Sequence, residues 1–302
     1  MKKVFLLIIV HILYISVCHA ENLDSIQKDD VVILYDDGLE NAAAAAARIY
    51  PVVKKGLEKA LGWEVDFYPA IYLVKEHEHF QRMSGHPLVV GYAVPEKLLI
   101  VIDYSKMLTT PSSVSSIMKH ELCHLLLHKN ISAENLPKWF DEGVSQWVSG
   151  GLADIVMADY SYFDSVIITG RQIPFRYLSE RFPADNEALM IAYAQSKSIV
   201  EYIAGEFNPD GICRLLNSLR SGKDMEIAVY ESFLISFDEL EENWYSAMRK
   251  KATWLTLFIN NFYEFIFFFG ALSLVAAYVK TVIRKRAMRD DEDDDSDLRQ
   301  YP

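Results

Sequence analysis

The sequence predicts an α+β fold, with a mixed sheet in its N-terminal part, helices in its C-terminal part and one transmembrane helix near the C-terminus. Three observations lead to this prediction. Short apolar runs come first, helical patterns follow from Pro111 onward, and a long apolar run lies near the end of the chain. No internal repeat or Pro/Gly/Ser-rich linker divides residues 25–250, which we therefore expect to form one domain with a substantial core.

The N-terminal part contains the expected strands and one long helix. Residues 39–61 are rich in alanine and have a helical pattern, in which we expect a kink at Pro51. Strands are expected at the short apolar runs 31–35, 69–74, 88–92 and 98–104, the last two separated by a turn at residues 95–97.

The first 20 residues have the pattern of a secretory signal peptide. Two lysines precede a mostly apolar run from Val4 to Val17, and the small residue Ala20 comes just before a polar stretch. Cleavage after Ala20 removes residues 1–20 and leaves residues 21–250 as the folded domain. An uncleaved anchor is one alternative. A lipoprotein attached through Cys18 is another, although Val17 is bulky for the position before a lipidated cysteine.

One transmembrane helix is expected at residues 258–280. About 20 residues of helix span the hydrocarbon core of a bilayer, and the apolar run from Phe258 to Val279 contains a single charged residue, Glu264. A buried amphipathic helix of the soluble domain is the alternative. The positive-inside rule places the tail, residues 281–302, in the cytoplasm, because five basic residues follow the run directly: Lys280, Arg284, Lys285, Arg286 and Arg289.

Charge and cysteine content exclude some classes of protein. The net charge is −12, and no basic stripe or nucleic-acid motif is visible, so a nucleic acid is not an expected partner. The cysteines, Cys18, Cys123 and Cys213, have no disulfide-framework spacing, and we do not expect Cys123 and Cys213 to be bridged. The acidic run at residues 290–297 is expected to be solvated and disordered, and has no assigned function.

The most informative segment is His120-Glu121-Leu122-Cys123-His124, which lies within a helical pattern. Residues four apart lie on one face of a helix, so both imidazoles can reach one metal ion. Neutral imidazole is a good ligand for zinc. Glu121 lies beside the histidines and can accept a proton from water. Thr110 and Pro111 are expected to form the cap and first turn of this helix.

A second segment, residues 136–143 (LPKWFDEG), follows after one short connection. A catalytic zinc site needs three protein ligands and one open position. Glu142 supplies the third ligand if the chain folds back as an antiparallel second helix, for which Pro137 suits the first turn. We expect Gly143 to permit a close approach to the first helix. A solvated surface glutamate is the alternative for Glu142.

Together these two segments resemble the gluzincin clan of metallopeptidases, and most closely its peptidase MA-like domains. The resemblance implies a zincin-like metallopeptidase domain at residues 21–250. It also implies a Zn2+ cofactor held by His120, His124 and Glu142, with Glu121 as the base.

The resemblance extends over roughly residues 30–250. Residues 91–95 resemble the substrate-side edge strand of such domains, and residues 240–244 resemble their last helix. Residues 192–196, which we expect to open a helix, resemble the later helix that carries the family's tyrosine. The resemblance therefore implies that Tyr193 holds the oxyanion, and a packed core tyrosine is the alternative.

Two departures from the family pattern narrow the expected activity. Gluzincin aminopeptidases carry a Gly-x-Met-Glu-Asn motif whose glutamate helps to hold the substrate amine. Residues 91–95 contain no acid, so we expect an endopeptidase. Thermolysin-like enzymes place an aspartate four residues after the third ligand, as the partner of a histidine. Here that position is Gln146, whose amide can still accept from an imidazole N–H with less electrostatic support.

The function implied by the resemblance is that of a membrane-anchored, extracytoplasmic zinc metallopeptidase acting on peptide or protein substrates. In such enzymes zinc polarises the scissile carbonyl, and a glutamate transfers the proton to the leaving amine. Two alternatives stay open. One is a catalytically silent zincin-fold scaffold or binding module, and the other is a hydrolase of a non-peptide amide.

Other histidines and tryptophans allow further interpretations. His77 and His79 could form a second metal site, or they could lie on an exposed loop or at a helix start. His128 lies one turn beyond His124 and could extend the metal cluster, although three ligands already suffice. Trp139 and Trp147 could pack helices together or form substrate platforms.

Overall fold

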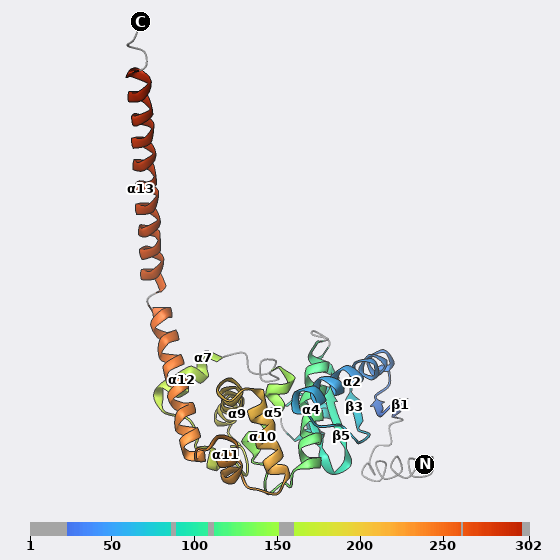
Figure 1. Cartoon of the computed structure of the whole chain (residues 1–302). Coiled ribbons are helices and arrows are strands. Elements are labelled where there is room, and N and C mark those ends of the chain that lie inside the picture. Colours follow the sequence, from blue (N-terminus) through green and yellow to red (C-terminus); the bar gives the residue numbers. More distant parts are fainter. Residues whose placement is uncertain (1–22, 86–88, 108–111, 151–159, 261, 298–302) are drawn as a thin grey trace. The chain divides into compact units, whose positions relative to one another are not determined.

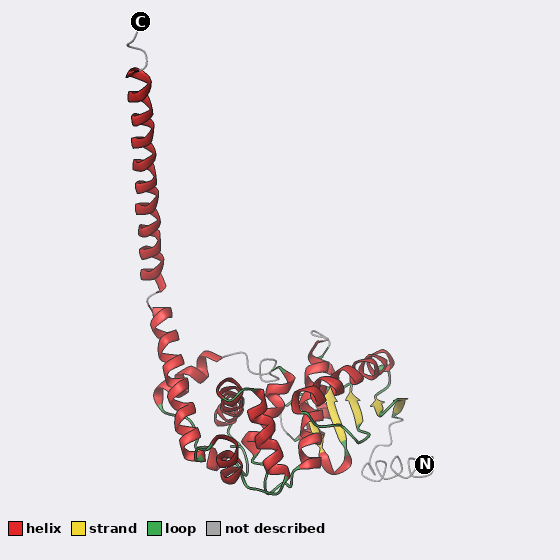
Figure 2. Ribbon diagram, viewed as in Figure 1, coloured by secondary structure: helices red, strands yellow, loops and turns green. Residues whose placement is uncertain are grey.

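A computed structural model of the chain describes residues 23–85, 89–107, 112–150, 160–260 and 262–297. The chain divides into two compact units, residues 1–247 and residues 248–302. The first unit has a sheet in its N-terminal part and helices after it (Figure 1; Figure 2), which confirms the predicted α+β class. The expected signal peptide, residues 1–20, lies outside the described residues.

Five strands form one mixed sheet in the order β1-β2-β3-β5-β4. Strands β2 (Val31–Tyr35), β3 (Ala70–Val74) and β5 (Leu99–Asp103) are parallel. Strands β1 (Asp24–Lys28) and β4 (Gly91–Val94) pair antiparallel at the two edges. The sequence does not predict β1, because its side chains are mostly exposed and give no apolar pattern.

The two faces of the sheet are covered by different helices. On one face Ile71, Ile100 and Ile102 have no exposed surface, and α2 (Glu40–Leu61) and α4 (Ser112–Asn130) pack there. On the other face Phe80 of α3 (His77–Ser84) packs with Tyr72, Val74 and Val101. Because side chains alternate along a strand, β3 is buried on both sides.

Helix α2 has the expected position and length. It continues through Pro51, which lies on its exposed side, and it ends at Gly62 in a left-handed conformation. Its buried alanines have small side chains, which let the helix lie close to its neighbours. The expected cap of α4 at Thr110 and Pro111 lies outside the described residues.

The helical part of the chain follows α4. Its elements are α5 (Lys138–Ser149), α7 (Tyr160–Thr169), α8 (Phe175–Leu178), α9 (Asn186–Glu206), α10 (Pro209–Arg220), α11 (Met225–Phe233) and α12 (Phe237–Asn260). Trp139 is fully buried, and its ring contacts the rings of Phe140, Phe175 and Phe237. Trp139 is therefore a packing residue of this part.

The helix that carries Tyr193 begins earlier than expected. The sequence places its start near Ala192, whereas α9 begins at Asn186. The Asp185 side chain accepts a hydrogen bond from the backbone N–H of Ala188 and caps the first turn. This cap extends the helix by almost two turns, so Tyr193 lies inside α9 and not at its opening.

The close approach expected at Gly143 is made to a different helix. A Cβ atom at this position would lie 2.3 Å from the backbone oxygen of Ser196 and 2.7 Å from Val200 Cγ2, both in α9. The prediction that Gly143 faces the first helix is therefore wrong. Successive residues of a helix are about 100° apart, so Glu142 can face α4 while Gly143 faces α9.

Among the described residues, one helix, near the C-terminus, is long and apolar enough to cross a membrane. This helix, α13 (Phe262–Asp297), contains the candidate span Phe262–Val282. It starts a few residues later than the expected 258–280, and it continues through the acidic run that the sequence suggests to be disordered. Cys123 and Cys213 are free thiols, as expected.

The Gly143 contact predicts a large difference between two glycine substitutions. Gly143→Ala should destabilise the protein by about 1–3 kcal/mol, because backbone atoms of α9 must move. Gly205→Ala, in α9 with nothing within 4 Å of the new Cβ, should be neutral or stabilise by up to about 1 kcal/mol. Denaturant unfolding of both variants measures the difference. Equal stability of Gly143→Ala and wild type would contradict the proposed packing of α5 on α9.

Candidate metal centre

Helices α4 and α5 lie side by side and run antiparallel. Near the start of α4, the Ser116 hydroxyl donates to the backbone oxygen of Ser149, at the end of α5, over 2.8 Å. Further along α4, His124 contacts Asp141, near the start of α5. The expectation that the chain folds back after the first motif is therefore confirmed.

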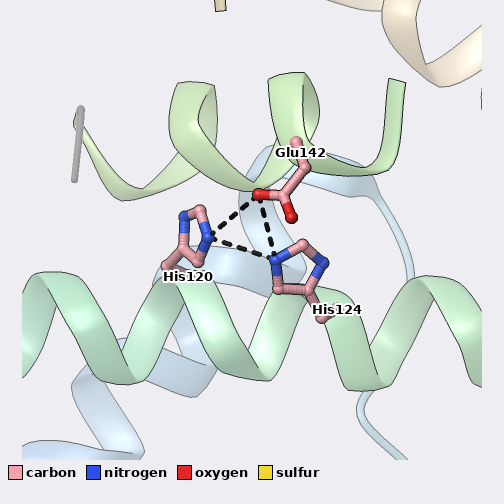
Figure 3. Close-up of side chains that lie close together, drawn as sticks. All are labelled: His120, His124 and Glu142. Carbon is pink, nitrogen blue, oxygen red and sulfur yellow. Dashed lines mark hydrogen bonds and ion pairs between the residues drawn. The ribbon is translucent and has the colours of Figure 1, made fainter. Parts of the chain in front are cut away.

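This arrangement brings His120, His124 and Glu142 together, as Figure 3 shows. The two Nε2 atoms are 3.1 Å apart, and each lies 3.6 Å from Glu142 Oε2. All three residues are buried. A solvated surface position for Glu142 is excluded.

The three donor atoms fit a bound zinc ion. A point equidistant from them lies about 2.0 Å from each at its closest, which matches zinc–nitrogen and zinc–oxygen bonds in proteins. Two imidazole nitrogens that face each other at 3.1 Å also need a proton or a cation between them. His120, His124 and Glu142 would hold the ion, and within the described residues no second group of this kind is found.

Asp141 orients His124. Its Oδ1 lies 2.6 Å from His124 Nδ1, and because a carboxylate can only accept, Nδ1 carries the proton and Nε2 is left to face the centre. The expectation that the Gln146 amide accepts from an imidazole N–H is not met at either histidine, and Nδ1 of His120 has no partner among the described residues. The Gln146 amide donates to the backbone oxygen of Tyr193 over 3.1 Å, and its own oxygen has no partner among the described residues.

His128 binds the other oxygen of Asp141. Its Nε2 lies 3.1 Å from Asp141 Oδ2, so it does not extend the metal cluster. Burial alone would raise the pKa of Asp141, but His124, His128 and Lys138 together hold it well below its usual range. Asp141 is therefore a charged acceptor shared by two histidines. The only signal for it in the sequence is a carboxylate directly before the third ligand.

Lys138, to which the sequence interpretation assigns no role, contacts the third ligand. Its Nζ lies 2.8 Å from Glu142 Oε1 and 3.8 Å from Asp141 Oδ2. Burial opposes ionisation of Glu142, but Lys138 and the two histidines hold its pKa well below the usual range. Glu142 is therefore an anionic ligand in this site.

Glu121 lies between the centre and the edge strand β4. It is 3% exposed, and burial is the main cause that raises its pKa above the usual value. A Cβ atom at position 91 would lie 3.2 Å from Glu121 Oε1 and 2.7 Å from Ile117 Cγ2. Only glycine at position 91 lets β4 pass this close to α4, so Gly91 brings the edge strand directly against Glu121.

Tyr193 lies within the electrostatic influence of the centre. The negative charge of Glu142 is the main cause that raises the pKa of its phenol, and burial adds to it, so the hydroxyl stays protonated. Its ring packs edge-on against Phe182, with ring centroids 5.1 Å apart.

His77, His79 and Trp147, which the sequence also singles out, lie outside the centre. His77 begins α3, and its Nδ1 lies 2.5 Å from Oδ2 of the fully buried Asp103, so it serves to pair this carboxylate. His79 belongs to no group of metal-binding side chains among the described residues. Trp147 lines an open hollow of about 780 Å³ next to α2 and α10.

The contact between Asp141 and His124 predicts a specific loss of metal affinity. Asp141→Asn should lower the affinity for zinc by about 10–100-fold, because the amide no longer fixes the His124 tautomer. The matched control is Asp103→Asn, which changes another buried carboxylate that pairs with a histidine at 2.5 Å. The control should lose stability and keep its affinity for zinc. Competition with a chromophoric chelator measures the affinity, and equal zinc affinities in the two variants would count against an orienting role for Asp141.

The chain is similar in structure to two larger solved proteins, at low sequence identity. Yeast LTA4 hydrolase in complex with Bestatin is 12% identical with a TM-score of 0.46, and the match covers 71% of this chain and 37% of that one. An M1 zinc metallopeptidase from Deinococcus radiodurans is 12% identical with a TM-score of 0.41, and the match covers 75% of this chain and 50% of that one. The chain thus spans half or less of the length of these proteins. A search of curated protein sequences gives no match.

The family comparison covers more than half of the chain. Residues 89–250 match the family described as the peptidase MA superfamily. The matched range contains the edge strand, both motif helices and α9, and His120, His124 and Glu142 lie together within it. The chain therefore belongs to the peptidase MA superfamily and carries its metal-binding triad of two histidines and a glutamate intact.

Proposed function

We propose that this chain is a membrane-anchored zinc endopeptidase. The observation that carries the proposal is the position of Glu121, a buried carboxylate that adjoins the His-His-Glu centre and lies directly against the edge strand β4. A base, a metal site and a strand edge that can hold an extended peptide therefore meet at one place. A silent scaffold would not need this combination.

Peptide hydrolysis requires a proton transfer that Glu121 is placed to perform. A zinc ion held by His120, His124 and Glu142 supplies Lewis-acid polarisation of the scissile carbonyl and makes water more acidic. The Glu121 carboxylate accepts a proton from water and later passes it to the leaving amine. Its pKa, raised chiefly by burial, brings it closer to neutral pH, where a general base and acid works best.

Tyr193 is proposed as a donor to the developing oxyanion. Because Glu142 and burial raise its pKa, the phenol keeps its proton and can donate a hydrogen bond. Gln146 donates to the backbone oxygen of Tyr193 and thereby ties this turn of α9 to α5. Such a preorganised donor acts most strongly on charge that forms in the transition state.

The edge strand supports an extended peptide as the substrate. β4 pairs with β5 along one edge, and no strand among the described residues pairs with its other edge. An extended peptide can bind such an edge through main-chain hydrogen bonds. Residues 91–95 contain no acid to hold a free N-terminal amine, which favours internal cleavage.

Helix α13 supports anchoring in a membrane. Its candidate span of 21 residues is long enough to cross a bilayer. Large apolar side chains such as Phe267, Leu274 and Tyr278 are more than two-thirds exposed, so they need a lipid or protein environment. The basic residues after the span favour a cytoplasmic tail, and with it a metal centre on the outer side of the membrane.

Substitution of Glu121 separates an enzyme from a silent scaffold. In purified chain, Glu121→Gln should retain about one zinc ion and lose about 10²–10⁴-fold in kcat, because the proton acceptor is gone. His124→Ala should lose both the zinc and the activity. A library of peptides with blocked N-termini, analysed by mass spectrometry, measures internal cleavage. Cleavage confined to peptides with free N-termini would refute endopeptidase action, and undiminished turnover by Glu121→Gln would refute the mechanism.

Removal of one oxygen tests Tyr193. If the hydroxyl supports the oxyanion, Tyr193→Phe should lose roughly 10²–10³-fold in kcat, with little change in KM, zinc content or melting temperature. If the hydroxyl only packs, the variant should lose about 1 kcal/mol of stability and keep its turnover. Steady-state kinetics and thermal unfolding of the same preparation distinguish these outcomes.

Topology can be tested by protease protection. In sealed cells or spheroplasts, protease added outside should digest residues 21–250 and spare an epitope placed after residue 297. Digestion of the tail with protection of the N-terminal domain would reverse the proposed orientation. Release of the intact chain by carbonate washing would exclude a spanning helix.

A further inference from the structure

The two oxygens of the Glu142 carboxylate have different surroundings. Oε2 faces the histidines, 3.6 Å from Nε2 of His120 and of His124. Oε1 lies 2.8 Å from the ammonium group of Lys138. Only Oε2 of Glu142 therefore faces the centre, while the ammonium group of Lys138 contacts Oε1.

The position of Lys138 is not explained by the stability of its helix. It is the first residue of α5, where a positive charge opposes the helix dipole. A lysine four residues before a glutamate is also the weaker order for a helical ion pair. The two carboxylates that it faces, Glu142 and Asp141, are both buried, so the attraction of Lys138 is directed at the metal site.

The number of oxygens that Glu142 offers matters for catalysis. A carboxylate can bind a metal through one oxygen or through two, and a catalytic zinc site needs three protein donors and an open position. If Glu142 offered both oxygens, the second would fill the position where water and the substrate carbonyl must enter. A group that holds Oε1 away from the metal keeps this position free.

We propose that Lys138 is a positioning residue that holds Oε1 of Glu142 and so limits this glutamate to a single donor oxygen, Oε2. The inference rests on the proposed zinc site and adds a residue outside the ligand triad. Lys138 contacts Glu142 and Asp141, and it is not one of the three residues that would hold the metal. It acts through the carboxylate that it orients.

Three variants of the full-length chain, purified in detergent, test this role. Lys138→Met removes the charge and the donor but keeps the length of the side chain, and Lys138→Arg keeps both. The matched control is Lys223→Met, because the Lys223 side chain is also 39% exposed and also pairs with a carboxylate, that of Glu231. Neither Lys223 nor Glu231 belongs to the metal centre. If Lys138→Met does not fold, Lys138→Ala, which favours the helix, replaces it.

The decisive measurement is the coordination of the bound metal, read without any substrate. In Lys138→Met, X-ray absorption at the zinc edge should show one more oxygen neighbour than in wild type. The visible absorption of the cobalt-substituted protein should lose intensity, because cobalt with more ligands absorbs more weakly. Lys138→Arg and Lys223→Met should keep the wild-type spectra.

The outcomes separate this inference from the proposed function. A wild-type chain that binds no zinc overturns the proposed function, and the role of Lys138 with it. Wild type that binds zinc, with Lys138→Met giving unchanged zinc-edge and cobalt spectra, overturns the role of Lys138 alone. A changed spectrum that Lys138→Arg restores supports it, since a merely structural lysine would not alter the metal's ligand number.

Discussion

The structure depends on positive charge that compensates three buried carboxylates carried by α4 and α5. Glu121, Asp141 and Glu142 are each at most 5% exposed. A buried charge without a partner is costly, and removal of one member of a buried pair typically costs about 3–5 kcal/mol. Lys138, the histidines and a bound cation supply the opposite charge. Folding and metal binding are therefore expected to be coupled in this protein.

The segment Lys138–Glu142 builds much of the centre from five consecutive residues. Glu142 is the third donor, Asp141 holds the tautomer of His124, and Lys138 contacts the outer oxygen of Glu142. Trp139 and Phe140 are fully buried between these polar residues and anchor the helix in an aromatic cluster. Because anchor, ligand and orienting groups share one helical turn, their relative positions are set by local geometry. Displacement of α5 would move all of them together.

Two glycines allow the edge strand β4 and helix α9 to lie close to the helices that carry the metal-binding residues. Gly91 lets the edge strand pass against Glu121, and Gly143 lets α9, which carries Tyr193, lie against α5. A side chain at either position would separate one of these elements from the centre. The proposed base, edge strand and oxyanion donor thus converge because two close backbone approaches are possible. This convergence connects the packing of the domain to the proposed peptidase activity.

The sequence by itself determined the α+β class, the three central strands and the metal triad. The strands follow from short apolar runs, and the spacing of four places His120 and His124 on one helical face. Glu142 follows from the second segment and from its resemblance to the gluzincin pattern. Pro137 and the short connection before it were sufficient to indicate the returning helix. The same local signals could not show β1, whose side chains are polar and exposed.

Only the tertiary structure decided which groups surround the triad. Asp141, and not Gln146, meets His124, because the antiparallel register of α4 and α5 sets which side of α5 faces that ring. The same packing turns Gly143 toward α9 and brings Gly91 against Glu121. Such contacts join residues far apart in the chain, and they depend on the crossing of whole helices. Local periodicity contains no information on that crossing, whereas the i, i+4 geometry of the two histidines is complete within a single helix.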